Sequence, residues 1–234
     1  MNINQTQMVQ AISLSLLTSA ITTGITFIFG TPVALLLTYR KSKLFSIIDT
    51  VVDLPTVLPP SVAGIALLMA FGRRGIFGPW LSEFNITIPF TMIAVVIAQT
   101  FVASPFYIKA AAIGFSSVEE ELKQAAALDG ANRWQILRDV ILPISWSSIL
   151  SGAVMTWARA LGEFGATIIF AGNFPGKTQT MPLAIYIGFE INLDVALTLS
   201  VILIGLSFFT LILIKGILHR RLEYAPGNFT NTTF

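Results

Sequence analysis

Two opposite charges lie inside one long apolar stretch of this sequence. Arg159 and Glu163 are the only charged residues from 140 to 170, and their four-residue spacing places them on one face of a helix. Charges at membrane depth usually mark a functional site, but a neighbouring opposite charge is also a ready structural explanation. The pair therefore has two interpretations: it lines a translocation path or gate, or it is a salt bridge that locks helices together.

A second candidate is segment 171–178, Ala-Gly-Asn-Phe-Pro-Gly-Lys-Thr, which imitates a phosphate-binding loop. Its first residue is alanine where the motif has glycine. The apolar run before it continues back to Val140 as a full membrane span instead of a short strand. The context therefore argues against ATP binding at Lys177.

Side chains that carry redox or metal chemistry are almost absent. The sequence has no cysteine, and its single histidine, His219, lies in a basic tail. Disulfides, thiolate metal sites and histidine clusters are therefore improbable, and we expect no cofactor or metal on this chain. The formal charge of +2 suits cytoplasmic loops beside anionic lipid, whereas nucleic-acid binding would need a folded basic domain.

The composition places these residues in a lipid bilayer. Hydrophobic residues make up 54% of the 234 positions, charged residues make up 11%, and the mean hydropathy is +0.78. Too few polar side chains remain to coat a water-soluble globule of this size. Because an α-helix needs about 20 mostly apolar residues to cross a bilayer, the sequence predicts an all-α membrane protein.

Five stretches are long enough to cross: about 8–39, 47–71, 89–114, 140–170 and 195–218. The second contains Asp49, Asp53, Pro55, Pro59 and Pro60, so we expect its first part to be irregular and its helix to begin near Pro59. Segment 181–191 is apolar but too short to span, and we predict that it is re-entrant or interfacial.

Lysine and arginine are enriched in cytoplasmic loops and so predict the orientation. With five spans, the basic residues at 40–43, 123–138 and 220–221 fall on one side, which is then cytoplasmic. The N-terminus would lie outside and the C-terminus inside, although Arg73 and Arg74 fall on the outer side and argue against this. The first apolar run is far longer than a signal-peptide core, so we expect it to be retained.

The longest polar connection, residues 116–143, predicts two short helices. Ser116 or Ser117 can cap the first helix, with Glu120 completing a capping box. Gly130 ends it in a left-handed conformation, and a second helix follows over about 132–139. Most loops are only connectors, but a helix-Gly-helix knob also suits docking into a groove of another protein.

This loop resembles the coupling motif of ABC-importer permeases: Glu-Ala-Ala, three residues, Gly, nine residues, Ile-x-Leu-Pro. The spacing is intact, with Gln124 in place of glutamate and Val140 in place of isoleucine. Because Gln124 is uncharged, it cannot make the charged contact of a glutamate. The resemblance implies that the loop docks into a cleft of an ATP-hydrolysing subunit. The implied ATPase-coupling residues are Glu121, Gln124, Ala125, Ala126, Asp129, Gly130, Leu142 and Pro143.

Segments 51–78, 116–143 and 157–186 together resemble molybdate-type permeases with type I ABC importer architecture, over nearly the whole chain. Sulfate and tungstate permeases share much of the Gly-Glu-Phe-Gly pattern at 162–165. The resemblance thus implies an importer of a tetrahedral oxyanion, with molybdate first and tungstate or sulfate as alternatives. It adds Gly162, Phe164 and Gly165 to the candidate path or gate.

The implied partners are two cytoplasmic ABC ATPase subunits and an extracytoplasmic oxyanion-binding protein, so the chain would be a transport subunit without its own ATPase site. Five helices are few to wall a pore, which favours a homodimer with the path on its two-fold axis. Two ridges of small residues support close helix packing. They are Ser15, Ser19, Thr22, Thr26 and Gly30, and Ser148, Gly152, Thr156 and Ala160.

These expectations give one transmembrane permease domain, residues 1–221, and a short polar cytoplasmic tail, residues 222–234. The predicted location is a bacterial-type inner membrane. The rival hypothesis is a secondary transporter or channel that works without an ATPase. Such a protein would show repeated halves or charges along several spans for ion coupling, and we find neither pattern.

Overall fold

The computed structural model describes residues 5–39 and 42–223, and every regular element in these ranges is a helix. The helices are α1 (Gln5–Tyr39), α2 (Lys43–Val57), α3 (Pro60–Phe71), α4 (Gly78–Glu83), α5 (Met92–Ser116), α6 (Glu120–Leu128), α7 (Arg133–Gln135), a π-helical turn (Ile136–Ile141), α8 (Leu142–Leu161), α9 (Gly165–Phe170), α10 (Met181–Ile191) and α11 (Leu193–Glu223). The predictions for Arg40, Lys41 and residues 224–234 fall outside the described residues.

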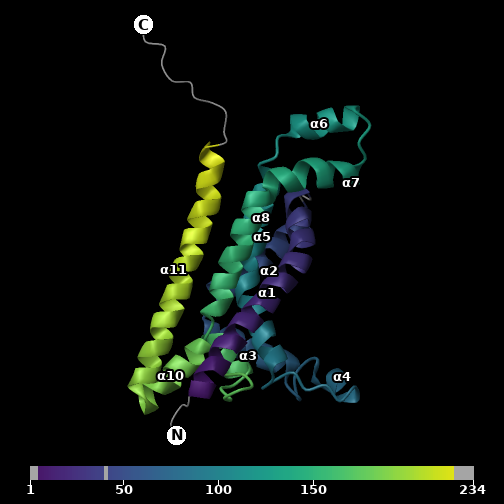
Figure 1. The fold of residues 1–234 in the computed structure, drawn as a ribbon. Coiled ribbons are helices and arrows are strands. Elements are labelled where there is room, and N and C mark those ends of the chain that lie inside the picture. Colours follow the sequence, from purple (N-terminus) through teal and green to yellow (C-terminus); the bar gives the residue numbers. More distant parts are fainter. Residues whose placement is uncertain (1–4, 40–41, 224–234) are drawn as a thin grey trace.

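The helices form an elongated bundle in which α1, α5 and α8 pack against one another (Figure 1). Helices α6 and α7 lie at one end of this bundle, and α3, α4 and α10 lie at the opposite end. The chain starts α1 at the end remote from α6 and finishes α11 at the end near α6. The all-α prediction is confirmed for the described residues.

Four helical runs are long and apolar enough to cross a membrane: α1, α5, Arg133–Leu161 and α11. A fifth crossing exists only if α2 and α3 count as one span, and they are bent by 120° at their junction. Helix α10 has 11 residues and is too short to span, as predicted.

The first half of the predicted second span is more regular than expected. Helix α2 runs unbroken through Pro55, so the predicted irregularity is wrong. The break falls at Leu58 and Pro59, each of which precedes a proline and has an extended backbone, with ψ of 134°. A proline disfavours the helical conformation of the residue before it, which explains both the bend and the start of α3 at Pro60.

The predicted fourth span, 140–170, is not one helix. Helix α8 ends at Leu161, the chain leaves helical geometry at 162–164, and α9 begins at Gly165. Helix α9 then packs against α3 at the end of the bundle remote from α6. Helix α8 is capped by Gly162, and the Glu163 side chain accepts from the Ala166 amide in the first turn of α9, although the apolar sequence continues.

Both small-residue ridges pack against α5. A Cβ at Gly152 would lie 2.9 Å from Cβ of Ala110, and one at Gly30 would lie 2.9 Å from Cδ1 of Tyr107. The Thr156 hydroxyl donates to the carbonyl of Ala103 at 3.3 Å. Small side chains thus let three helix backbones approach closely, as the packing interpretation predicts.

Candidate functional site

Helix α6 begins later than the serines of the predicted cap. Ser116 is the last residue of α5, and Ser117 follows it. Their hydroxyls donate to the carbonyls of Ile113 and Gly114 at 2.9 and 2.8 Å. The predicted capping box of Ser117 with Glu120 is therefore wrong, because α5 extends to the serines and uses them at its own end.

Gly130 ends α6 as predicted. Its φ is +89°, a left-handed conformation that glycine adopts without the Cβ clash that most residues meet there. The amide of Gly130 donates to the carbonyl of Ala127, and that of Ala131 donates to Ala126, at 3.1 and 3.0 Å. This pair of bonds is a Schellman motif, which satisfies the last carbonyls of the helix.

Asn132 starts the next helix with a capping box. Its side chain accepts from the amides of Trp134 and Gln135, each at 3.0 Å, and the Gln135 side chain accepts from the Asn132 amide at 2.7 Å. The prediction that this helix ends near 139 is wrong, because the helix continues through the π-helical turn into α8. A proline cannot donate to a preceding carbonyl, and the wider π turn accommodates Pro143 without a break.

The α6 loop projects a partly apolar surface beyond the bundle (Figure 1). Leu128 is 89% exposed and Trp134 is 66% exposed. The predicted coupling residues on α6 and its cap lie beside them, and all except the half-buried Ala126 are exposed: Glu121, Gln124, Ala125, Asp129 and Gly130. Leu142 and Pro143 lie on α8 instead, where Leu142 packs against the core. Trp134 and Leu128 belong to this surface, although the motif does not include them.

Lys123 fastens α6 to the end of α1. Its Nζ lies 2.9 Å from Oε2 of Glu120 and 5.1 Å from the centre of the Tyr39 ring. Burial lowers the pKa of Lys123, but the Glu120 carboxylate and Tyr39 raise it more, so the pKa lies above its ordinary value. The ammonium thus stays charged at neutral pH and holds α6 close to the membrane helices.

Arg159 and Glu163 form the predicted pair, at 2.7 Å between Nη1 and Oε2. The Glu163 side chain is 1% exposed and that of Arg159 is 30% exposed. The other carboxylate oxygen, Oε1, accepts from the amide of Ala166 at 2.8 Å, in the first turn of α9. Glu163 therefore joins α8 to α9, and the salt-bridge interpretation accounts for its contacts.

Two glycines let α9 cross closely over α3. A Cβ at Gly165 would lie 2.6 Å from Cβ of Pro60, and one at Gly64 would lie 2.8 Å from the Ala166 carbonyl oxygen. A Cβ at Gly162 would meet only its own helix, at 3.7 Å. Phe164 points to the other side, where its ring lies 5.3 Å from that of Tyr186. The predicted path-or-gate residues thus lie at one helix junction.

The segment that imitates a phosphate-binding loop uses its own backbone donors internally. The amides of Lys177, Thr178 and Gln179 all donate to the carbonyl of Phe174, at 2.9 to 3.1 Å. The Thr178 hydroxyl accepts from the Phe174 amide at 3.1 Å. The segment joins α9 to α10 at the end of the bundle remote from α6. These donors are not free to cradle a phosphate, which agrees with the sequence argument.

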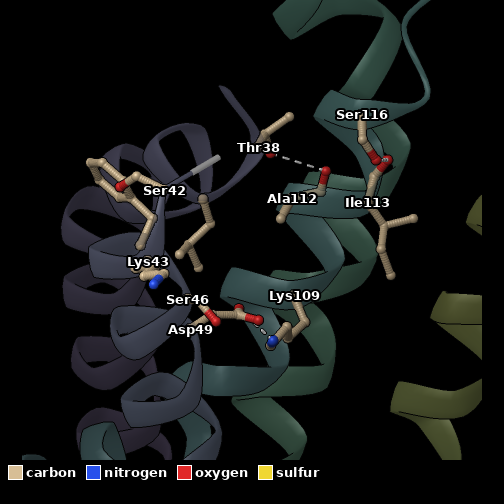
Figure 2. Close-up of a pocket in the computed structure, with 11 residues that line it drawn as sticks. Thr38, Ser42, Lys43, Ser46, Asp49, Lys109, Ala112, Ile113 and Ser116 are labelled. Carbon is tan, nitrogen blue, oxygen red and sulfur yellow. Dashed lines mark hydrogen bonds and ion pairs between the residues drawn. The ribbon is translucent and has the colours of Figure 1, made fainter. Parts of the chain in front are cut away.

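The structure also brings together three charges that the sequence reasoning missed. Lys109 on α5 lies 2.6 Å from Oδ1 of Asp49 and 2.8 Å from Oδ2 of Asp53, both on α2. Figure 2 shows Asp49 and Lys109 beside a hollow of about 710 Å³. Lys109 is the only charged residue from 89 to 114, and that isolation was the available signal. Among the described residues, no group of three His, Cys, Asp or Glu side chains is placed to hold a metal ion.

Residues 27–224 match the family model of the binding-protein-dependent transport system inner membrane component. This chain belongs to that family. A probable transport system permease protein NifC from Clostridium pasteurianum is 42% identical over 208 residues, covering 88% of this chain and 73% of the relative. The molybdenum transport system permease protein ModB of Mycobacterium bovis is 40% identical, covering 83% and 74%. The sulfate transport system permease protein CysW of Synechococcus elongatus is 35% identical, covering 94% and 77%.

Solved structures share the fold of this permease. A structure of the MetNI methionine ABC transporter in an inward-facing conformation matches with a TM-score of 0.72 at 19% identity, covering 92% of this chain and 95% of that one. A bacterial alginate ABC transporter, solved in complex with a periplasmic protein, matches with a TM-score of 0.68 at 18% identity, covering 92% and 79%. The chain is thus an ABC transporter permease with the type I importer fold, and a multi-pass membrane protein.

Proposed function

We propose that this chain is the transmembrane permease subunit of an ATP-driven importer that moves molybdate. The observation that carries the proposal is the α6 surface, with exposed Leu128 and Trp134, in a chain 40% identical to a molybdenum permease over most of its length. An exposed apolar surface on a polar loop suits docking of another protein.

In this proposal, two copies of the chain form the path, and each copy receives one ATPase subunit on its α6 loop. ATP is hydrolysed only in those subunits, and the permease needs no cofactor. An extracytoplasmic binding protein delivers the anion at the opposite end. The α6 end is cytoplasmic, so α1 starts outside and α11 ends inside the cell.

Sulfate is a specific second candidate substrate, because the CysW sulfate permease aligns with 94% of the chain. Tungstate remains the other alternative, since it shares the tetrahedral shape and charge of molybdate. These anions differ mainly in size, so the binding protein is expected to select among them before they reach the permease.

The test is uptake into proteoliposomes that contain the permease, its ATPase subunit and its binding protein. We expect ATP-dependent uptake of labelled molybdate, and weaker competition by sulfate than by unlabelled molybdate. Uptake that is equal without the ATPase subunit would support the rival secondary transporter or channel. ATP-dependent uptake of sulfate but not of molybdate would support an importer whose substrate is sulfate.

A further inference from the structure

Lys109, Asp49 and Asp53 form a charged cluster between two membrane helices. The ammonium bridges both carboxylates, and the three side chains remain 36%, 47% and 44% exposed in the single chain. Packing within this chain therefore covers only part of each charge. Something outside the described residues of one copy must cover the rest.

The cluster lies on α2 and α5, about two to three helical turns from the ends of these helices that face α6. Helix α2 begins next to the α6 end, because α1 ends at Tyr39, whose ring contacts Lys123. At 1.5 Å per residue, Asp53 lies about 15 Å along α2 from Lys43, and Lys109 lies about 10 Å from the end of α5 at Ser116. Charges at such depth face a bundle interior or a water-filled cavity, because hydrocarbon cannot solvate them.

Helix α2 shows which of its faces meets lipid. Ile47, Val51 and Leu54 form an apolar stripe, and these side chains are 60%, 60% and 48% exposed. At 100° per residue, Asp49 and Asp53 lie on the opposite side of the helix. If the apolar stripe faces hydrocarbon, the carboxylates and Lys109 face away from it.

The face with the charges borders the hollow of about 710 Å³ (Figure 2). Most of the side chains around this hollow are polar, among them Thr38, Ser42, Lys43 and Ser46. Lys43 adds a second ammonium group to the lining of the hollow. Lys109 uses two of its three N–H donors on Asp49 and Asp53, which leaves one donor for an anion.

We infer that this face lines the inner, water-filled vestibule of the translocation path, with Lys109 as the cation that a tetrahedral oxyanion contacts there. The inference rests on the proposed function. Because Asp49 and Asp53 offset the charge of Lys109, the vestibule passes an anion without trapping it. Arg159 and Glu163 lie at the other end of the bundle, so the two charged sites mark different depths of the membrane.

Cysteine accessibility tests the location of water, and the native chain contains no cysteine. Ser46→Cys and Ala112→Cys place a thiol at the hollow, whereas Ile47→Cys and Val51→Cys place one on the apolar stripe of α2. The complete complex with its ATPase subunits is placed in lipid nanodiscs, where both sides of the membrane are accessible. An anionic, water-soluble methanethiosulfonate is added, and the modified fraction is followed by mass spectrometry.

We expect the thiols at the hollow to react at least about tenfold faster, since apolar surroundings raise a thiol pKa by a unit or more and deplete the reactive thiolate. Slow reaction at all four positions would show a dry contact and overturn the vestibule. Equally fast reaction at all four would overturn the assignment of the apolar stripe to lipid, and the vestibule with it.

A charge-free variant tests the role of Lys109. The combined substitution Asp49→Asn, Asp53→Asn and Lys109→Gln removes all three charges and leaves no unpaired ion. We expect ATP hydrolysis to remain coupled to the binding protein while molybdate uptake falls about tenfold, the effect of one lost charged hydrogen bond. Unchanged uptake would overturn the anion contact. If the variant fails to assemble, the ratio of thiol modification rates between the hollow and the apolar stripe of α2 decides whether the vestibule exists.

The two proposals fail in different ways. If the wild-type complex takes up molybdate with ATP, but the thiols of the Ser46→Cys and Ala112→Cys variants react slowly, the vestibule alone is contradicted. Wild-type complex without ATP-dependent uptake contradicts the proposed function itself.

Discussion

At the scale of single residues, Glu163 carries two contacts at the α8–α9 junction. One carboxylate oxygen pairs with Arg159, and the other accepts from the amide of Ala166. The pair is therefore a structural joint whatever else it does. A gate function would require that the pair affects transport independently of its effect on stability. Variants of Arg159 and Glu163 can separate these two effects.

Glu163→Ala should lower the stability of the assembled permease by about 3 kcal/mol, because it leaves Arg159 unpaired near a buried site and removes the α9 cap. Arg159→Gln with Glu163→Gln should lose less, since it removes both charges and keeps polar groups in place. Thermal unfolding in detergent gives both values. If the double variant is stable but transports nothing, the gate interpretation gains support; normal transport favours the purely structural role.

Gly165→Ala should destabilise the permease by roughly 1–3 kcal/mol, since its Cβ would overlap Pro60 and push α9 away from α3. Gly162→Ala is the matched control, because a Cβ there meets only its own helix, at 3.7 Å, and φ is −89°. Thermal unfolding compares the two variants. Equal losses of stability in the two variants would show that there is room for a Cβ at Gly165 between α9 and α3.

At the scale of elements, α6 is held at its C-terminal end and at its middle. Gly130 and the Schellman bonds close its C-terminus, and Lys123 attaches its middle to Tyr39. The helix before it and the capping box after it then set the direction of the loop. Each of these contacts is local in sequence or lies at the end of a neighbouring helix.

Substitutions at Gly130 test the docking surface. A Cβ at Gly130 meets no atom of this chain within 4 Å, so only the left-handed φ constrains the residue. Gly130→Val should strain the turn by about 1–2 kcal/mol, whereas Gly130→Asn tolerates this conformation. We expect both to weaken binding of the ATPase subunit in a pull-down and to lower ATPase coupling, with Gly130→Asn leaving the permease fold unaltered. Normal coupling in both variants would refute docking at this surface.

The attachment of α6 should not depend on pH near neutrality. The pKa of Lys123 in the folded protein lies above its ordinary value of 10.5. The stabilising contact is thus complete below the unfolded pKa and is lost only as the pH rises through the folded pKa. We expect hydrogen exchange of α6, corrected for intrinsic rates, to stay constant from about pH 6 to about pH 9. Loss of protection within this range would contradict the contact, and Lys123→Met should reduce protection at every pH.

At the scale of the whole molecule, the bundle has two distinct ends. Helices α6 and α7 mark one end, and the segments with Arg73, Arg74 and Lys177 lie at the other, near α4 and α10. Helix α1 starts remote from α6 and α11 finishes near it. This arrangement agrees with the prediction of five spans if the α2–α3 pair counts as one of them.

Reporter labels test this topology. A thiol at Ser82 in α4 and one at Ala131 beside α6 should be modified from opposite sides of intact cells, with Ser82→Cys reached from outside. Modification of Ala131→Cys in intact cells and of Ser82→Cys only after lysis would invert the orientation. It would also mean that Arg73 and Arg74 follow the positive-inside rule after all.

Features that depend on local patterns could be predicted from the sequence. Apolar length predicted α1, α5 and α11, the glycine at 130 predicted the turn after α6, and the spacing of Arg159 and Glu163 predicted their pair. Predictions of helix ends were wrong where the same residues are compatible with two different structures. The serines at 116 and 117 could end one helix or start the next, and the second helix of the loop could end near 139 or continue into α8.

Which distant segments meet could be seen only in the folded protein. Lys109 lies 60 residues from Asp49, and Gly165 lies against Pro60, the first residue of α3 after its 120° bend from α2. Prolines in the sequence mark where a helix breaks, but they do not specify the direction in which the chain leaves. That direction follows from packing of α3 on α9 and of α2 on α5, and it creates both the joint at Glu163 and the charged hollow at Lys109.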